Sequence, residues 1–168
     1  MNQAKYPLEQ LAIIKQKRVE EAEKVLKEKR ELLAKEEEKF LALCRERDAV
    51  KEHKEAKLNQ LRETLDAGTT SDKIQQMKNY LKEVTDQLKA KEAKVHTQQK
   101  QLDLAKEAVE IARKERIKKQ QEVEKLKLHR EEWEKELAKE EERIQGIETD
   151  ELGSSMFVRK TKKGKKRH

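Results

Sequence analysis

The sequence predicts an all-α fold, a long two-helix antiparallel coiled-coil hairpin with unequal arms. Two long stretches, from Pro7 to Ala67 and from Lys73 to Gln145, contain no internal Gly or Pro. Both stretches repeat apolar residues at heptad spacing, and only the segment Gly-Thr-Thr-Ser-Asp at 68–72 separates them. One break midway along such a pattern lets the chain fold back on itself.

Composition favours a narrow apolar seam over a wide core. The chain has 168 residues, of which 46% are charged and 33% hydrophobic, whereas a compact domain usually has about 45–50% apolar residues. Ala, Leu, Glu, Lys, Gln and Arg dominate, and these are strong helix formers. Because the apolar residues are periodic, we expect one elongated helical unit and not a disordered chain.

The second stretch keeps one heptad frame throughout. Its a positions are Ile74, Leu81, Leu88, Val95, Leu102, Val109, Arg116, Val123, Arg130, Leu137 and Ile144. Its d positions are Met77, Val84, Lys91, Gln98, Ala105, Ala112, Lys119, Leu126, Trp133, Glu140 and Ile147.

The first stretch follows the heptad pattern less regularly. One position of its frame holds Ala12, Val19, Leu26, Leu33, Phe40 and Leu61, and the other holds Ala22, Leu43 and Val50. Leu58, Leu61 and Leu65 follow spacings of three and four, which predicts a stutter and a locally loosened seam.

The predicted boundaries follow from capping residues. Pro7 suits a first helical position, Gly68 suits a helix C-terminal cap, and Thr70 or Ser71 can cap the next helix. We therefore predict one hairpin domain over 1–152, with helices over about 7–67 and 72–148 and a turn at 68–71. The remainder, 153–168, is predicted to be a disordered basic tail.

Folding about residue 69 places residue i near residue 138 − i, so the second arm overhangs the first beyond Arg130. The apolar overhang residues lack a facing part of the same chain and are Trp133, Leu137, Ile144 and Ile147. An exposed apolar stripe on a helix is typical of a partner site. Trp133 and Leu137 could instead close the seam against residues preceding Pro7, or pair with a second copy.

Positive charge is concentrated at the C-terminal end. Seven of the 42 basic residues lie between Phe157 and His168, which leaves 35 against 35 acidic residues elsewhere. Such a cluster can bind phosphate, but only Phe157 is aromatic and no nucleic-acid module accompanies it. A solubilising or acidic-partner-binding tail is the favoured interpretation.

Candidate chemistry is sparse, so an enzyme is not expected and neither is a cofactor. His53, His96, His129 and His168 are scattered, and no set has the spacing of metal ligands. Cys44 is the only cysteine, which fits a reducing compartment. Without an apolar leader or membrane-length run, we expect a cytoplasmic protein.

The unequal, highly charged two-helix pattern resembles the YscO/FliJ family of bacterial type III secretion and flagellar export, and its YscO branch in particular. The residues that carry the resemblance are Val19, Leu26, Leu33 and Phe40, the series Ile74 to Val109, the turn at Gly68, and the start Tyr6-Pro7-Leu8-Glu9-Gln10-Leu11. The resemblance spans about residues 5–150 and leaves out the basic tail.

The resemblance implies a cytoplasmic stalk, peripheral to the inner-membrane export apparatus, that enters a hexameric secretion ATPase. Its further partners would be the export gate protein or secretion chaperones. The implied ATPase contact comprises Leu8, Leu11, Ile14, Arg18, Trp133 and Leu137. The implied contact near the turn comprises Met77, Tyr80 and Val84.

Two other functions stay open from the sequence. One is a homo-oligomeric coiled-coil scaffold whose arms pair between chains, and the other is a nucleic-acid-associated coiled coil anchored by its basic tail. A monomer of the hairpin is the favoured state.

Overall fold

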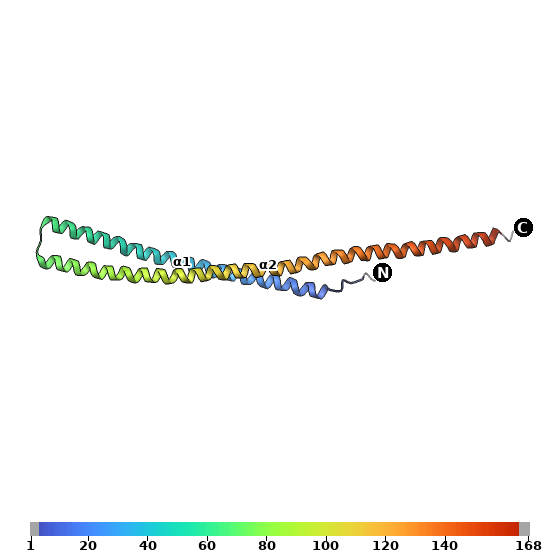
Figure 1. Ribbon diagram of the computed structural model, residues 1–168, viewed down its shortest axis with the longest axis horizontal. Helices are drawn as coiled ribbons and strands as arrows, with labels where there is room; N and C mark the ends of the chain where they lie inside the picture. The colour runs from blue at the N-terminus through green and yellow to red at the C-terminus, as the bar shows by residue number, and fades with distance from the viewer. Residues whose placement is uncertain (1–3, 165–168) are drawn as a thin grey trace. The chain divides into compact units, whose positions relative to one another are not determined.

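The chain folds into two helices joined by a short turn. The structure is a computed structural model that describes residues 4–164, with side chains described up to residue 161. Helix α1 runs Glu9–Ala67 and helix α2 runs Ser71–Gly164 (Figure 1). Residues 4–164 contain no strand. The predicted all-α, two-helix hairpin is confirmed.

Gly68 ends α1 in the way the sequence predicts. Its φ of 79° lies in the left-handed region that a side chain disfavours, and its N–H donates to the Leu65 carbonyl at 3.3 Å. At the start of α2 the Thr70 carbonyl accepts the first helical bond, from the N–H of Ile74 at 3.2 Å. The chain therefore reverses direction over only a few residues.

The buried residues follow the predicted heptad frame. In α1 they are Val19, Leu26 and Leu61, and in α2 they are Val84, Leu88, Val95, Leu102, Ala112 and Val123. Each lies at an a or d position, so the seam is narrow, as a two-stranded coiled coil requires. Within the described residues no charged or polar side chain is fully buried.

The predicted stutter near Leu61 is absent. Leu61 lies whole heptads after Phe40, and Arg47 and Lys54, at the intervening positions, are half-buried. Leu65, the residue that suggested a change of frame, is exposed. The frame continues because the aliphatic stems of Arg and Lys can cover apolar surface while their charged ends reach water.

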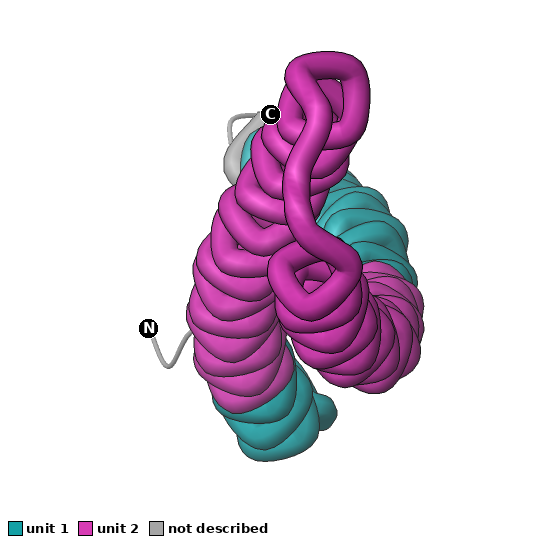
Figure 2. Tube along the Cα trace, turned by 90° about the vertical axis from the view of Figure 1, so that its left-hand side faces the viewer, with its two compact units in different colours: residues 1–19, 118–168 teal, residues 20–117 magenta. Residues whose placement is uncertain are grey.

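By proximity the chain divides into two compact units, and each contains part of both helices (Figure 2). The terminal unit comprises residues 1–19 and 118–168, and the turn unit comprises residues 20–117. The sequence predicts a single domain over 1–152, because its heptad pattern runs on without a shift in composition. Arg116 and Lys119, two charged seam residues, flank the boundary at 117/118.

Contacts within each unit support the predicted pairing of residue i with residue 138 − i. In the terminal unit Lys15 pairs with Glu122 at 2.6 Å. In the turn unit Lys91 pairs with Glu46 at 2.8 Å and Arg116 with Glu23 at 3.3 Å. Each partner lies within one residue of the predicted position.

Helix α2 extends beyond its predicted end near Glu148, and residues 153–164 are helical where the sequence predicts a disordered tail. Isolated glycines cost a helix only about 1 kcal/mol each, so Gly146 and Gly153 weaken it without ending it. Basic residues such as Arg159 and Lys160 also favour a helix C-terminus. Residues 165–168 of the predicted tail lie outside the described part.

Neither α1 nor α2, within residues 4–164, has an apolar stretch long enough to cross a membrane.

Candidate functional site

Tyr6 anchors the segment before α1 to α2 in the terminal unit. Its side chain is only 5% exposed, and its ring meets Trp133 edge-on with centroids 5.5 Å apart. The Tyr6 hydroxyl and His129 Nδ1 share a hydrogen bond of 2.7 Å. The N-terminal segment is thus fixed by an aromatic cluster, and not by continuation of the heptad seam.

Arg130 joins both helices beside this cluster. Its guanidinium lies 5.5 Å from the Tyr6 ring centroid and pairs with Glu9 at 2.9 Å and with Glu134 at 3.1 Å. The hydrogen bond to Glu134 and the charge of Glu9 raise the pKa of Arg130. Arg130 occupies a seam position, but its charged end is paired at the edge of the seam, where water remains accessible.

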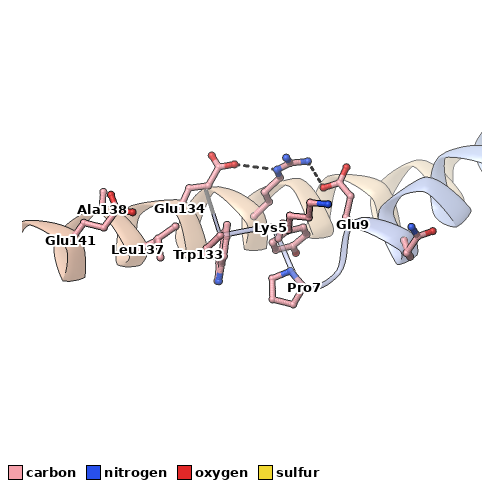
Figure 3. Close-up of a pocket in the computed structure, with 12 residues that line it drawn as sticks. Lys5, Pro7, Glu9, Trp133, Glu134, Leu137, Ala138 and Glu141 are labelled. Carbon is pink, nitrogen blue, oxygen red and sulfur yellow. Dashed lines mark hydrogen bonds and ion pairs between the residues drawn. The ribbon is translucent and has the colours of Figure 1, made fainter. Parts of the chain in front are cut away.

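An open groove of about 890 Å³ lies between the anchored segment and α2. Figure 3 shows Pro7 on the Glu9 side of Trp133, whereas Leu137, Ala138 and Glu141 continue along α2 in the other direction. Trp133 and Leu137 are half-buried and contribute to the apolar part of the lining, together with Tyr6, Pro7 and Ala138. Lys5, Glu9, Glu134 and Glu141 supply charge around it. The groove combines an apolar floor with a charged rim, an arrangement typical of a protein-binding surface.

The overhang of α2 begins further along the helix than the sequence indicates. Trp133 does face part of its own chain, because Tyr6 packs against it, which confirms the alternative that residues before Pro7 close the seam. The sequence pattern missed Tyr6 because it lies outside the heptad frame. Ile144 and Ile147, further along α2, are exposed.

All six residues of the implied ATPase contact belong to the terminal unit. Trp133 and Leu137 line the groove, whereas Leu8, Leu11, Ile14 and Arg18 do not. Leu11, Ile14 and Arg18 are exposed along α1, and Leu8, just before α1, is half-buried. The structure thus separates the predicted set into a groove pair on α2 and an exposed row on α1.

The implied contact near the turn is only partly available. Tyr80 is exposed, and its hydroxyl shares a hydrogen bond of 2.8 Å with His53 Nε2. Lys57 lies 5.7 Å from the Tyr80 ring centroid, and Met77 is half-buried. Val84 is only 1% exposed and belongs to the core, because it occupies a d position of the seam. An accessible surface here includes Met77 and Tyr80 but not Val84.

The charge pattern on the helices stabilises their pairing. Lys91 lowers the pKa of Glu46, and Lys15 lowers the pKa of Glu122, chiefly by hydrogen bonding. Both carboxyl groups therefore stay ionised in ordinary ion pairs. In residues 4–164, no three side chains of His, Cys, Asp or Glu gather closely enough to hold a metal ion.

The family model of YscO-like proteins matches residues 3–163 of this chain. The chain belongs to the YscO-like family. A solved structure also matches, that of CT670 from Chlamydia trachomatis, described as a candidate YscO homologue. It is 48% identical, its TM-score is 0.87, and the match covers 92% of this YscO-like chain and 95% of that one. None of the curated proteins compared with the chain matches it.

Membership of the YscO-like family gives the chain a general role. It is a type III secretion-related protein with a helical, coiled-coil-like fold. The resemblance that the sequence predicts is therefore confirmed, including its YscO-like branch.

Proposed function

We propose that this YscO-like chain is a non-enzymatic stalk that inserts its terminal unit into the hexameric export ATPase of a type III secretion apparatus. It would work in the cytoplasm, against the inner-membrane export apparatus. The observation that carries the proposal is the pair of apolar surfaces on one unit: the groove at Trp133 and Leu137, and the exposed row at Leu11 and Ile14. A partly apolar groove and exposed apolar residues on the same unit favour a protein partner.

Helix continuity supports a mechanical role. Helix α2 has 94 residues without a break. Charged residues cover most of the surface of both helices, which limits nonspecific adhesion. A partner that holds the terminal unit could therefore transmit rotation or asymmetry through the hairpin.

We also propose that the turn unit contacts the export gate protein or a secretion chaperone. Met77 and Tyr80 would supply this contact, with Lys57 beside the Tyr80 ring. Tyr80 supports the proposal because an exposed aromatic side chain is a frequent anchor in protein interfaces. Val84 would contribute by holding the two helices together behind that surface.

Binding to the purified secretion ATPase tests the stalk proposal. The Leu11→Lys/Ile14→Lys variant replaces exposed apolar side chains, so we expect intact helicity and at least a tenfold loss of affinity. Leu41→Lys is the matched control, because Leu41 is also exposed on α1 but lies in the turn unit. Equal ATPase affinity in the wild type and the double variant would exclude this row as the contact.

The groove needs a separate comparison, because Trp133 also packs against Tyr6. We expect Trp133→Ala and Leu137→Ala to abolish ATPase binding. Tyr6→Ala releases the anchored segment without removing either groove residue. If Tyr6→Ala alone reproduces the loss, anchoring of the N-terminal segment and not direct contact explains the effect of Trp133→Ala.

Mass in solution distinguishes the stalk from a homo-oligomeric scaffold. In both units α1 pairs with α2 of the same chain, which favours a monomer of 19.9 kDa. A scaffold whose arms pair between chains would have at least twice that mass. A salt-dependent nucleic-acid binding assay after deletion from Phe157 onward tests the third alternative, anchoring by the basic tail.

A further inference from the structure

One side of the turn unit carries more apolar surface than a two-helix seam needs. Val25 and Leu32 on α1 are 45% and 49% exposed, and they directly precede Leu26 and Leu33. The series that contains Leu26 and Leu33 is the a position of α1, because the other seam position follows three residues later, as Ala22 follows Val19. On α2, Leu104 and Ile111 are 58% and 69% exposed, and the half-buried Ala108 lies between them. These five residues form what we define as the apolar patch.

Contacts on both sides of the patch bring its two halves together. Glu23 pairs with Arg116 at 3.3 Å, and the Glu36 carbonyl accepts a hydrogen bond from Gln98 at 3.2 Å. Residues 23–36 of α1 therefore lie alongside residues 98–116 of α2, which places Val25 and Leu32 level with Leu104 to Ile111.

The hydrogen bond between His53 and Tyr80 fixes which side of the seam these residues share. Both residues directly precede an a position, as Val25, Leu32 and Ala108 do, and their side chains meet at 2.8 Å. Residues at this heptad position thus lie on one common side of the seam. Leu104 and Ile111 lie one turn to either side of Ala108 on the same face.

The opposite side of the same stretch is charged. A small hollow there is lined by Leu26 and by four charged residues, Glu23, Lys27, Arg30 and Arg116. Exposed apolar residues do occur on that side, but Leu41 and Ile117 are far apart along the helices. A stripe wider than a and d is typical of helices that pack against more than one neighbour.

We propose that the apolar patch docks one amphipathic helix of a partner protein as a third helix. Five residues are far fewer than the roughly 20–30 a side of a standard protein interface, which disfavours a stable pair of two copies. A docked helix needs only a few apolar anchors at i, i+3, i+4 and i+7. Val25, Leu32, Leu104 and Ile111 of the patch supply four aliphatic contacts, which suits one docked helix.

The charges along the two edges of the patch define the chemistry of this helix. Glu21, Glu28 and, at its far end, Lys35 border it on α1, and Lys100 and Lys114 border it on α2 with Glu107 between them. None of these six makes an ion pair within the described part of the chain. The α1 edge has a net negative charge and the α2 edge a net positive charge, so the docked helix carries mainly basic residues along one edge of its apolar stripe and mainly acidic residues along the other.

A designed peptide tests the patch directly. The probe is a helix of roughly 18 residues, or about five turns, with leucines at the anchor spacing, lysines along one edge and glutamates along the other. We expect saturable binding by fluorescence anisotropy, and a loss of roughly tenfold or more in Leu32→Lys and in Ile111→Lys. Leu41→Lys and Ile117→Lys, which change exposed apolar residues on the other side, should stay within about twofold of the wild type.

A change of charge gives a second readout. Glu21→Lys/Glu28→Lys makes the α1 edge basic, so the variant should prefer a peptide with glutamates along both edges over the mixed peptide. Equal weakening by the patch and control substitutions, or no measurable binding by the wild type, would overturn the proposal. So would a dimer in sedimentation that Leu32→Lys dissociates, because a second copy would then occupy the patch. The patch shares no residue with the proposed ATPase contact, so either proposal can fail alone.

Discussion

The rings of Tyr6 and Trp133 meet edge-on, with centroids 5.5 Å apart and planes inclined by 61°. This contact joins a residue before α1 to a residue of α2 and closes the terminal unit at the N-terminal end of the seam. It turns Trp133, the only tryptophan of the chain, into a reporter of whether the N-terminal segment is anchored.

Tyr6→Ala should release the segment before α1. Burial of a large apolar side chain is worth about 1.5–3 kcal/mol, so we expect faster amide exchange in the first turns of α1 and a red-shifted Trp133 emission. Tyr6→Phe keeps the ring and loses only the hydrogen bond to His129, worth about 1 kcal/mol. Unchanged emission in Tyr6→Ala would contradict the anchoring role of Tyr6.

The continuous heptad frame makes opposite predictions for two nearby leucines. Leu61 is buried at a seam position, so Leu61→Ala should lower the free energy of unfolding by about 2–5 kcal/mol. Leu65 is exposed, so Leu65→Ala should change it by no more than about 0.5 kcal/mol. Chemical denaturation measures the free energy of unfolding of both variants. If Leu65→Ala loses more than about 0.5 kcal/mol, Leu65 contributes to the seam and the heptad frame does shift near Leu61.

The parts of this fold that could be predicted from sequence are those that repeat. The seam frame, the turn at Gly68 and the pairing of Lys15 with Glu122 follow from heptad spacing and one break. The anchor at Tyr6 does not repeat, so no periodic signal marks it. The extension of α2 was missed for a different reason: Gly153 suggests an end, but a single glycine costs less than its helix-forming neighbours supply.

In the candidate site, too, the features that follow the heptad repeat could be predicted and the others could not. Heptad spacing identified Trp133 and Leu137 as seam positions beyond the first arm, and both line the groove. The family resemblance, and not the spacing, placed Val84 in the implied surface near the turn, whereas heptad spacing puts it at a d position, which is normally buried. The apolar patch depends on exposure at residues adjacent to the seam, which requires the pairing of both helices to be known.

Replacement of glycine by alanine should lower stability at Gly68 and raise it at Gly146 and Gly153. Gly68 has a left-handed φ of 79°, so Gly68→Ala should destabilise the hairpin by about 1–2 kcal/mol even though nothing lies within 4 Å of an added Cβ. Gly146 and Gly153 are inside α2, also with open space around them. Their replacement by alanine should stabilise that part of α2 by about 0.5–1 kcal/mol each.

Thermal unfolding measures the effect of Gly68→Ala, and helicity with amide exchange measures the effects of Gly146→Ala and Gly153→Ala. An increase in stability for Gly68→Ala would mean that the turn does not need its left-handed conformation. Reduced helicity in the other two variants would argue against a continuous α2 beyond Glu148.

Ion pairs between the helices should make stability depend on pH in the acidic range. Hydrogen bonds from Gln98, Lys91 and Lys15 lower the pKa values of Glu36, Glu46 and Glu122, respectively, below the ordinary value of 4.5. The unfolded chain then binds more protons than the folded chain in this range. The stabilisation is therefore complete above pH 4.5 and is lost as the pH falls through the lower folded-state pKa values.

Thermal unfolding between neutral pH and the range below 4.5 measures this dependence. Glu46→Gln/Glu122→Gln should be less stable than the wild type at neutral pH and should show a flatter decline, because it lacks two of the three carboxyl groups whose pKa is lowered by hydrogen bonds between the helices. Glu55→Gln is the matched control, since Glu55 is exposed and makes no ion pair within the described residues. A decline equally steep in the double variant and the control would show that other carboxyl groups cause the acid sensitivity.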